Sequence, residues 1–406
     1  MHRFRLIPGL VAIGMILLLA CQKQSGDTSG EKIEPLTKHW EKAVPLQTPP
    51  RGLKTLSAKE CGSCHMEIYQ EWKASFHAKA WFDPQFQVEW AKDDSLWVCI
   101  NCHTPLVNQQ PHLILGKKGG DYFQPVKKEN PNFDPALRDE GITCAVCHVR
   151  DGAVLGPYGN QKDAPHAVRK ATDGELSEKL CMSCHNVTDV LNPTLVCTFQ
   201  TGEEWKAGPY SKEGQTCITC HMPIIERPLY PKGPVRVTRK HIWIGSGIPK
   251  TMDEKAPVDH YIPGLELRVL TSKKRYQPGE TAYISVLLTN RRAGHLLPTG
   301  DPEYFFTVEL AVVDENGAAL QDTTLWIGQK WQWWPVAKKL KDNRIRPLET
   351  RNYPFVFSIP EDANHLRFRA IVRTHRMTRE IAEQAGLLGI YPLNIVSLKQ
   401  EVPLVE

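Results

Sequence analysis

The stretch Cys61-Gly-Ser-Cys64-His65 sets the organisation of this chain, because its pattern recurs four more times. In each copy two cysteines stand three positions apart and a histidine follows the second. The other copies are Cys99, Cys102, His103; Cys144, Cys147, His148; Cys181, Cys184, His185; and Cys217, Cys220, His221. The first cysteines of successive copies are 36 to 45 residues apart. This regular spacing predicts a string of small units, each built around one copy.

The pattern C-x-x-C-H is the attachment site of c-type haem. Its two thiols form thioethers with the two vinyl groups of one porphyrin, and the adjacent histidine becomes an axial ligand of the iron. The sequence therefore predicts five covalently attached haems, held by the ten motif cysteines, with the five motif histidines as iron ligands. Zinc binding through the cysteine pairs is the alternative, but the five uniform trailing histidines argue against it.

Each predicted iron has a second axial position, and its occupant decides the chemistry. A second histidine saturates the iron and restricts it to electron transfer, whereas an open position allows a small molecule to react there. The chain has 15 histidines, enough to fill every position. Four are predicted as distal ligands by their place near the motifs or in a rigid loop: His77, His166, His241 and His295. His112, His260 and His375 compete for the fifth iron, and we favour His375.

The first residues read as an export signal. Arg3 and Arg5 precede a short apolar run that ends in Leu-Leu-Ala-Cys21, which resembles a bacterial lipoprotein cleavage box. Residues 1–20 are then a lipoprotein signal peptide, Cys21 carries the lipid, and residues 21–56 form a flexible tether. The expected location is outside the cytoplasm on a bacterial membrane, with the residue after Cys21 pointing to the outer membrane, on its periplasmic or cell-surface face. An uncleaved signal anchor or an ordinary signal is the alternative.

The formal net charge of +5 over 406 residues is too small to indicate a nucleic-acid partner. Ten of the 12 cysteines belong to the motifs and one to the lipid site. The remaining one, Cys197, follows Leu195 and Val196, so we expect a small buried side chain rather than a ligand.

Residues 57–255 are predicted to form a pentahaem cytochrome c domain of short helices and irregular backbone, with the porphyrins as much of its core. We expect one helix from Ser57 to Trp81, capped by Ser57 with Glu60 and ended by Pro84. A second helix should begin near Ser177. The tetrapeptide Glu-Trp-Lys-Ala occurs at 71–74 and 204–207, either as two tryptophan-bearing helices against haem faces or as two unrelated surface helices.

Residues 262–406 have the pattern of an all-β domain. Runs rich in β-branched and aromatic residues alternate with turn signals such as Pro278-Gly279, which predicts an immunoglobulin-like sandwich. The predicted strands are 265–271, 281–290, 303–314, 352–359 and 366–374, and a short helix is expected near 378–386. Four tryptophans between Trp326 and Trp334 predict either a buried corner or a contact surface.

Three groups of residues make the chain resemble the multihaem c-type cytochromes related to cytochrome c-554. They are the first motif with the Glu-Trp-Lys-Ala-Ser-Phe-His77 segment, the fifth motif with Met222 and Pro223, and His241 with the Gly294–Gly300 loop. The resemblance implies electron transfer outside the cytoplasm through closely stacked haems, mostly with two histidine ligands. It strengthens the choice of His77, His166, His241 and His295.

Electron transfer in a respiratory chain is therefore the leading functional hypothesis, with redox proteins in or at the membrane as partners. The alternative is a multihaem reductase of a small nitrogen or sulfur oxyanion with one open haem, so whether the chain is an enzyme stays open. A third hypothesis is a subunit of a larger respiratory complex, docked through the β domain.

Overall fold

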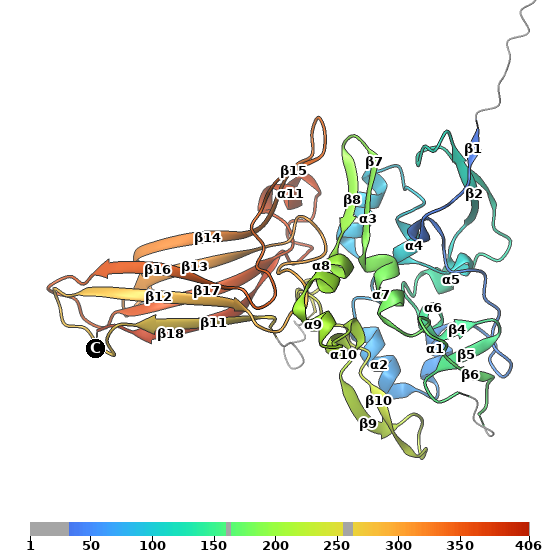
Figure 1. Ribbon diagram of the computed structural model, residues 1–406, viewed down its shortest axis with the longest axis horizontal. Coiled ribbons are helices and arrows are strands. Elements are labelled where there is room, and N and C mark those ends of the chain that lie inside the picture. Colours follow the sequence, from blue (N-terminus) through green and yellow to red (C-terminus); the bar gives the residue numbers. More distant parts are fainter. Residues whose placement is uncertain (1–31, 160–163, 255–262, 406) are drawn as a thin grey trace, which may run out of the picture.

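The computed structural model describes residues 32–159, 164–254 and 263–405, in two regions that lie side by side (Figure 1). The N-terminal region, residues 32–254, is a collection of short helices and small sheets. The C-terminal region, residues 263–405, is built of long antiparallel strands. The predicted signal peptide and Cys21 lie outside the described residues. None of the described helices is long and apolar enough to cross a bilayer.

The helices of the N-terminal region are short, and five of its twelve described helical elements carry motif cysteines. Four of the five motifs end a helix with their histidine: α4 (Ile100–His103), α6 (Cys144–His148), α7 (Glu178–His185) and α10 (Cys217–His221). As predicted, Ser177 caps α7 by accepting a hydrogen bond from the Lys179 N–H. The other helical elements are η1 (His39–Glu41), α1 (Ala58–Gly62), α2 (Met66–Ala74), α3 (Pro84–Lys92), η2 (Val107–Gln109), α5 (Pro135–Arg138), α8 (Thr201–Ala207) and α9 (Pro209–Lys212).

The single helix predicted for Ser57 to Trp81 is wrong. Ser57 does cap α1, but the helix ends at Gly62, and α2 begins only after the first motif. The break lies at His65, whose ψ of 53° leaves the helical range. Glu60 does not complete a capping box, because its carboxylate accepts from the Lys54 and Thr55 N–H groups instead. Pro84 starts α3 rather than ending a helix, since a first helical position needs no N–H.

Four small sheets complete the N-terminal region. Strand β1 (Ile33–Glu34) pairs with β2 (His112–Lys118), which pairs with β3 (Pro125–Glu129). A second sheet joins β4 (Val149–Arg150), β5 (Ala153–Gly156) and β6 (Val168–Lys170). Two hairpins, β7 (Val187–Asn192) with β8 (Leu195–Phe199) and β9 (Ile224–Pro228) with β10 (Val235–Arg239), project from the region.

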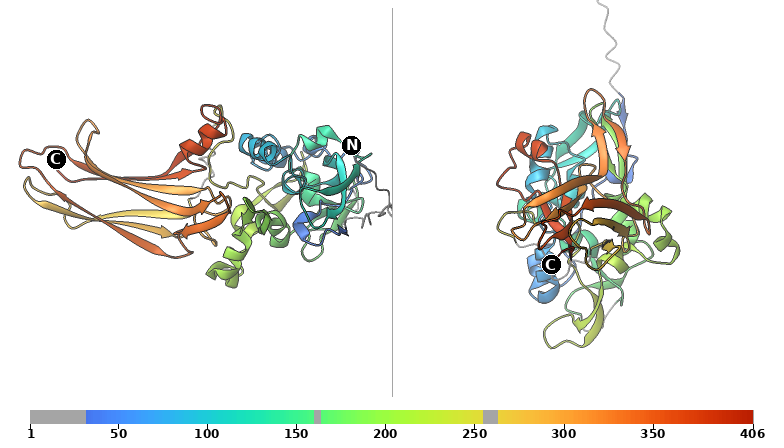
Figure 2. Two further views of the ribbon diagram at one scale, coloured as in Figure 1. Left: turned by 90° about the horizontal axis from the view of Figure 1, so that it is seen from above. Right: turned by 90° about the vertical axis from the view of Figure 1, so that its left-hand side faces the viewer.

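The C-terminal region consists of two antiparallel sheets that lie face to face (Figure 2) and share one apolar core. The smaller sheet has the order β11-β12-β16 and the larger the order β15-β14-β13-β17-β18. Buried side chains alternate along β12 and β17, so each sheet turns one face inward. The strands are β11 (Leu265–Thr271), β12 (Thr281–Asn290), β13 (Phe305–Val313), β14 (Ala319–Gln332), β15 (Lys338–Asp342), β16 (Thr350–Ser358), β17 (Arg367–His375) and β18 (Asn394–Pro403).

The five strands predicted for this region are present within three residues at each end. The short helix is α11 (Arg379–Gln384), capped by Thr378. Strands β14, β15 and β18 were not predicted, because their lysine and glutamine content hides the alternation. The antiparallel β architecture is confirmed, whereas its immunoglobulin-like type and the domain limits at 57–255 and 262–406 stay predictions.

Candidate haem centres

A single large cavity runs through the N-terminal region and is bounded on one side by loops of the C-terminal region. Its volume is 3620 Å³, whereas a pocket for one drug-sized ligand holds roughly 300–1,000 Å³. All ten motif cysteines and all five motif histidines line it. The space is therefore large enough for several porphyrins in contact with one another.

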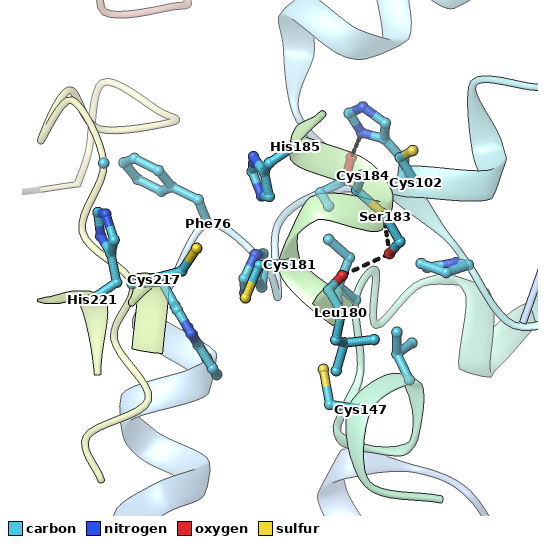
Figure 3. A pocket seen from close by; sticks show the side chains of 18 of the residues that line it. Phe76, Cys102, Cys147, Leu180, Cys181, Ser183, Cys184, His185, Cys217 and His221 are labelled. Carbon is cyan, nitrogen blue, oxygen red and sulfur yellow. Dashed lines mark hydrogen bonds between the residues drawn. The ribbon is translucent and has the colours of Figure 1, made fainter. Parts of the chain in front are cut away.

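The motif thiols approach one another in pairs that do not follow the order of the sequence. Cys61 of the first motif lies within hydrogen-bonding distance of Cys144 of the third. The second and fourth motifs meet at Cys102 and Cys184, as Figure 3 shows. The fourth and fifth meet at Cys181 and Cys217. Because each thiol would carry the edge of a porphyrin, these contacts would bring haem edges together. The predicted units, each built around one motif, would thus contact one another.

Four motif histidines stand opposite four of the histidines predicted as distal ligands. The ring-centre distances are 6.3 Å for His65–His166, 6.4 Å for His77–His185, 6.1 Å for His148–His241 and 6.4 Å for His221–His295. Two imidazoles that bind one metal ion from opposite sides, through metal–nitrogen bonds of about 2 Å, have ring centres roughly 6 Å apart. The four pairs thus have the spacing that one iron between them requires.

Hydrogen bonds on the far side of the rings prepare them for metal binding. Each Nδ1 below faces a backbone carbonyl, so it must donate, which leaves Nε2 with a free lone pair. The Nδ1–oxygen distances are 2.8 Å for His65 to Leu229, 2.8 Å for His103 to Ala80, 2.9 Å for His148 to Leu155, 2.9 Å for His241 to Arg239 and 2.9 Å for His295 to Leu296. The residues present therefore fit axial ligation of haem iron.

Burial favours the neutral form of eight histidine rings of the cavity. Desolvation lowers the pKa of His77 to about 3 and that of His103, His221 and His241 to about 4. It also lowers the pKa of His148, His166, His185 and His295. A neutral imidazole is the form that binds a metal ion.

His103 differs from the other motif histidines. Its ring is stacked on Phe86, with ring centres 3.6 Å apart and planes 9° from parallel. Among residues 32–159, 164–254 and 263–405, no histidine ring is paired with it as in the four pairs. The carboxylates of Glu89, Asp301 and Glu303 line the same cavity. Burial and mutual repulsion raise the pKa of Glu89 to about 8 and that of Glu303 to about 7.

The structure does not bring His375, our preferred fifth ligand, to a motif histidine. Its ring stacks on Phe305 at 4.4 Å, and its Nε2 lies 2.9 Å from the Thr307 hydroxyl. It lies on the rigid strand β17, where Thr307 on the neighbouring strand satisfies its polar edge. His112 lies on β2, 3.8 Å from the Glu129 carboxylate. His260 lies outside the described residues.

Two glutamates for which the sequence predicts no role hold segments that carry histidines predicted as distal ligands. Both belong to the Glu-Trp-Lys-Ala repeat. Glu71 accepts from the His241 N–H at 2.9 Å and pairs with Arg227 at 2.7 Å. Glu204 accepts from the Thr299 hydroxyl at 2.6 Å and pairs with Arg344 at 2.5 Å, next to the loop of His295. The repeat was a usable signal, but its partners are distant in sequence.

The tryptophans of the same repeat line the cavity. Trp72 Nε1 donates to the Ile142 carbonyl and Trp205 Nε1 to the Gln215 carbonyl, both at 2.8 Å. Trp243 was also not predicted. Its ring lies 4.8 Å from that of His77 and 5.2 Å from that of His241, between two histidine pairs. Cys197, as expected, packs against a cluster of buried apolar side chains.

Comparisons with known proteins bear on the family and the fold of the chain. Residues 60–149 match the family described as cytochrome c554 and c-prime, which confirms the resemblance over that segment. A penta-heme cytochrome c552 from Thermochromatium tepidum has a similar fold, with a TM-score of 0.61 and 18% identity over 86% of this chain and 98% of that chain. Spo0M, a sporulation control protein from Bacillus subtilis, matches 36% of this chain and 49% of its own at 12% identity, but its TM-score of 0.15 carries no argument. No curated protein sequence matches the chain.

Proposed function

We propose that this multihaem c-type cytochrome transfers electrons through five covalently bound haems, four of them ligated by the histidine pairs of the cavity. The observation that carries the proposal is the common ring-centre distance of 6.1 to 6.4 Å in those pairs. A haem iron with two histidine ligands has no open position, so it can exchange electrons but not bind a substrate. The contacts between motif cysteines support transfer from haem to haem.

The contacts also indicate how the haems would be connected. The fourth motif touches the second through Cys184 and the fifth through Cys181. The first motif touches the third, and Cys147 of the third lies near Cys181 and Cys184 of the fourth. The proposed path is therefore branched, with the fourth haem at its centre and the first, second and fifth haems at its ends.

The proposed setting is outside the cytoplasm, where c-type haem is attached. The lipid on Cys21, an outer-membrane location and redox partners in or at the membrane belong to this proposal, and so does a place in a larger respiratory complex. The lipid and the membrane location are supported by the lipoprotein-like cleavage box.

A spectroscopic count of low-spin and high-spin haems tests the ligand assignment. We expect at least four low-spin haems in the parent protein. In His77→Ala one of them should become high-spin and bind carbon monoxide, because the iron bound by His185 loses its second ligand. In the control His375→Ala the count should not change. An unchanged count in His77→Ala, or fewer than four low-spin haems in the parent, would contradict the assignment.

A second candidate function rests on His103 alone. No histidine of the described part of the chain stands opposite it. If none of the other residues fills this position, the haem of Cys99 and Cys102 would be open to a small molecule, as the reductase hypothesis requires. Glu89 and Glu303 would hold protons near neutral pH, which a reduction consumes. A reductase of an oxyanion also needs basic side chains that bind the anion, and this requirement has less support. Lys250 pairs with Asp83, and Arg376 donates to the carbonyls of Ile248, Pro249 and Pro392.

Rapid mixing separates the two candidates. The reduced holoprotein is mixed with nitrite or sulfite in excess, with a reductant present, and product is measured over time. Sustained product formation that falls in Glu89→Gln would favour the reductase. Carbon monoxide binding to His260→Ala and to the parent shows whether His260 fills the open position. A parent that neither binds carbon monoxide nor forms product acts as a carrier only.

A further inference from the structure

The tip of the hairpin formed by β14 and β15 exposes apolar side chains to solvent. Trp334 is 79% exposed, Leu340 60% and Val336 56%. Large apolar side chains gathered on one exposed tip are typical of interaction sites. Of the four tryptophans between Trp326 and Trp334, only Trp334 is largely exposed to solvent.

The base of the hairpin shows that this exposure is a consequence of the fold. Trp331 and Trp333 stack with ring centres 5.2 Å apart and planes 7° from parallel. Trp333 lines the haem cavity, and Trp326 stacks on Phe305. Trp334 is the residue after Trp333, and its side chain is exposed to solvent. Its position is therefore fixed by packed neighbours rather than by a loose loop.

Lysines surround the apolar tip. Lys338, Lys339 and Lys341 lie on β15, where every residue is exposed, and Lys330 lies on β14 opposite Lys341. Two of them lie over tryptophan rings, Lys330 over Trp326 and Lys339 over Trp331. The acidic side chain on β15 is Asp342, which pairs with Lys339 and Arg344. The tip therefore carries a clear excess of positive charge.

The hairpin is fixed to a second hairpin of the N-terminal region. The Ala337 N–H donates to the Pro193 carbonyl at 2.7 Å, which joins the tip of β14–β15 to the tip of β7–β8. On the latter, Val190 is 62% exposed. Figures 1 and 2 show both tips on the same side of the molecule as strand β1, where Ile33 is 56% exposed. We call Trp334, Val336, Leu340, Val190 and the four lysines the hairpin surface.

We propose that the hairpin surface binds the headgroup layer of a membrane that contains anionic lipids. An exposed tryptophan with aliphatic neighbours suits the apolar–polar boundary of a bilayer, and lysines are attracted to anionic headgroups. The surface lies on the side where the described chain begins. Residue 32 is eleven positions after Cys21, and eleven residues span at most roughly 40 Å. A lipid on Cys21 would thus keep this side of the molecule near the bilayer.

Vesicle flotation of the haem-loaded protein tests this proposal. A cleavable signal peptide of non-lipoprotein type in place of residues 1–20, together with Cys21→Ser, removes both the predicted lipid and the apolar leader, so that binding reports the folded surface alone. We expect binding to vesicles that contain phosphatidylglycerol, weaker binding to pure phosphatidylcholine vesicles, and loss of binding at high salt. Lys338→Glu with Lys341→Glu should weaken binding about tenfold or more, and Trp334→Ser with Leu340→Ser about tenfold.

Tyr283→Ser is the matched control, because Tyr283 is an aromatic residue on β12 that is 61% exposed. It should bind vesicles like the parent, and all variants should keep the parent's haem spectrum, which shows that they fold. Absence of binding to anionic vesicles overturns the proposal, as does equal loss in Tyr283→Ser. Binding to native membranes but not to protein-free vesicles overturns it in favour of a protein partner.

Discussion

The two regions of the molecule fill their interiors in opposite ways. Within the described residues, the C-terminal region has one core of 23 buried apolar residues, whereas the largest such cluster in the N-terminal region has seven. The N-terminal region instead encloses a cavity of 3620 Å³. The atoms that line an empty space inside a protein lack van der Waals partners on that side and lose the corresponding dispersion energy. The C-terminal region is therefore stabilised by its own apolar side chains, whereas the N-terminal region depends on its cofactors to fill its interior.

The largest effect is expected when the chain is produced without haem. Expression in the cytoplasm, without residues 1–20, prevents haem attachment. The N-terminal region should then stay unfolded, because the apolar walls of its cavity would face water. The C-terminal region should fold. Limited proteolysis with mass spectrometry should find cuts throughout residues 57–254 and protection of 263–405, while the haem-loaded protein resists in both regions. A haem-free N-terminal region that resists proteolysis would contradict the claim that this region needs its haems to fold.

The second test concerns the apolar core. Phe368 on β17 is fully buried and lies 5.1 Å from the ring of Phe355. Phe368→Ala should lower the unfolding free energy of the C-terminal region by about 3–5 kcal/mol. Denaturant unfolding followed by tryptophan fluorescence measures this loss. The haem spectrum should stay the same, apart from a change at the one haem that His295 would bind. Val356→Ala, at a position 49% exposed on β16, should cost less than about 1 kcal/mol.

The third test is the buried polar cluster of the N-terminal region. Burial alone would raise the pKa of Glu41, but hydrogen bonds from Lys117, the Lys38 N–H and Tyr122 lower it to about 2. Glu41→Gln leaves Lys117 buried without its partner and should cost about 3 kcal/mol. Because the folded pKa lies below the ordinary one, this stabilisation is fully present above pH of about 4.5 and is lost as the pH falls toward 2.

Unfolding of the holoprotein and of Glu41→Gln across this pH range provides the measurement, and the two curves should converge in acid. Glu203→Gln serves as the control, because Glu203 pairs with Lys206 on the exposed side of α8. That variant should lose less than about 0.5 kcal/mol. A Glu41→Gln difference that stays constant down to pH of about 2 would contradict the assigned pKa.

Sequence and structure agree best where the signal is local. The five motifs, the caps at Ser57, Ser177 and Thr378, and the strands with regular alternation are each encoded within about ten residues. The helix through His65 was predicted wrongly for a related reason. Its periodicity continues across the motif, but the backbone must turn there to direct His65 into the cavity.

Relationships between distant segments were harder to predict. The pairing of particular motif histidines with His77, His166, His241 and His295 depends on the cavity, and no spacing along the chain indicates it. His375 is favoured over His112 and His260 in the sequence prediction, yet the neighbouring strand gives it Thr307 as a partner. The role of Glu71 and Glu204 was visible only as a repeated tetrapeptide, since Arg227 and Arg344, their partners, stand in unrelated sequence.

The four histidine pairs have a consequence for how the chain unfolds. Each pair would close a loop through its iron, and the loops 65–166, 77–185, 148–241 and 221–295 overlap one after another. Closing a loop of this length removes conformational entropy from the unfolded chain, as a disulfide does. Because the last loop reaches His295 in the C-terminal region, the two regions would be linked by coordination bonds as well as by backbone. Denaturant that melts both regions would still leave a cross-linked chain until the iron ligands exchange.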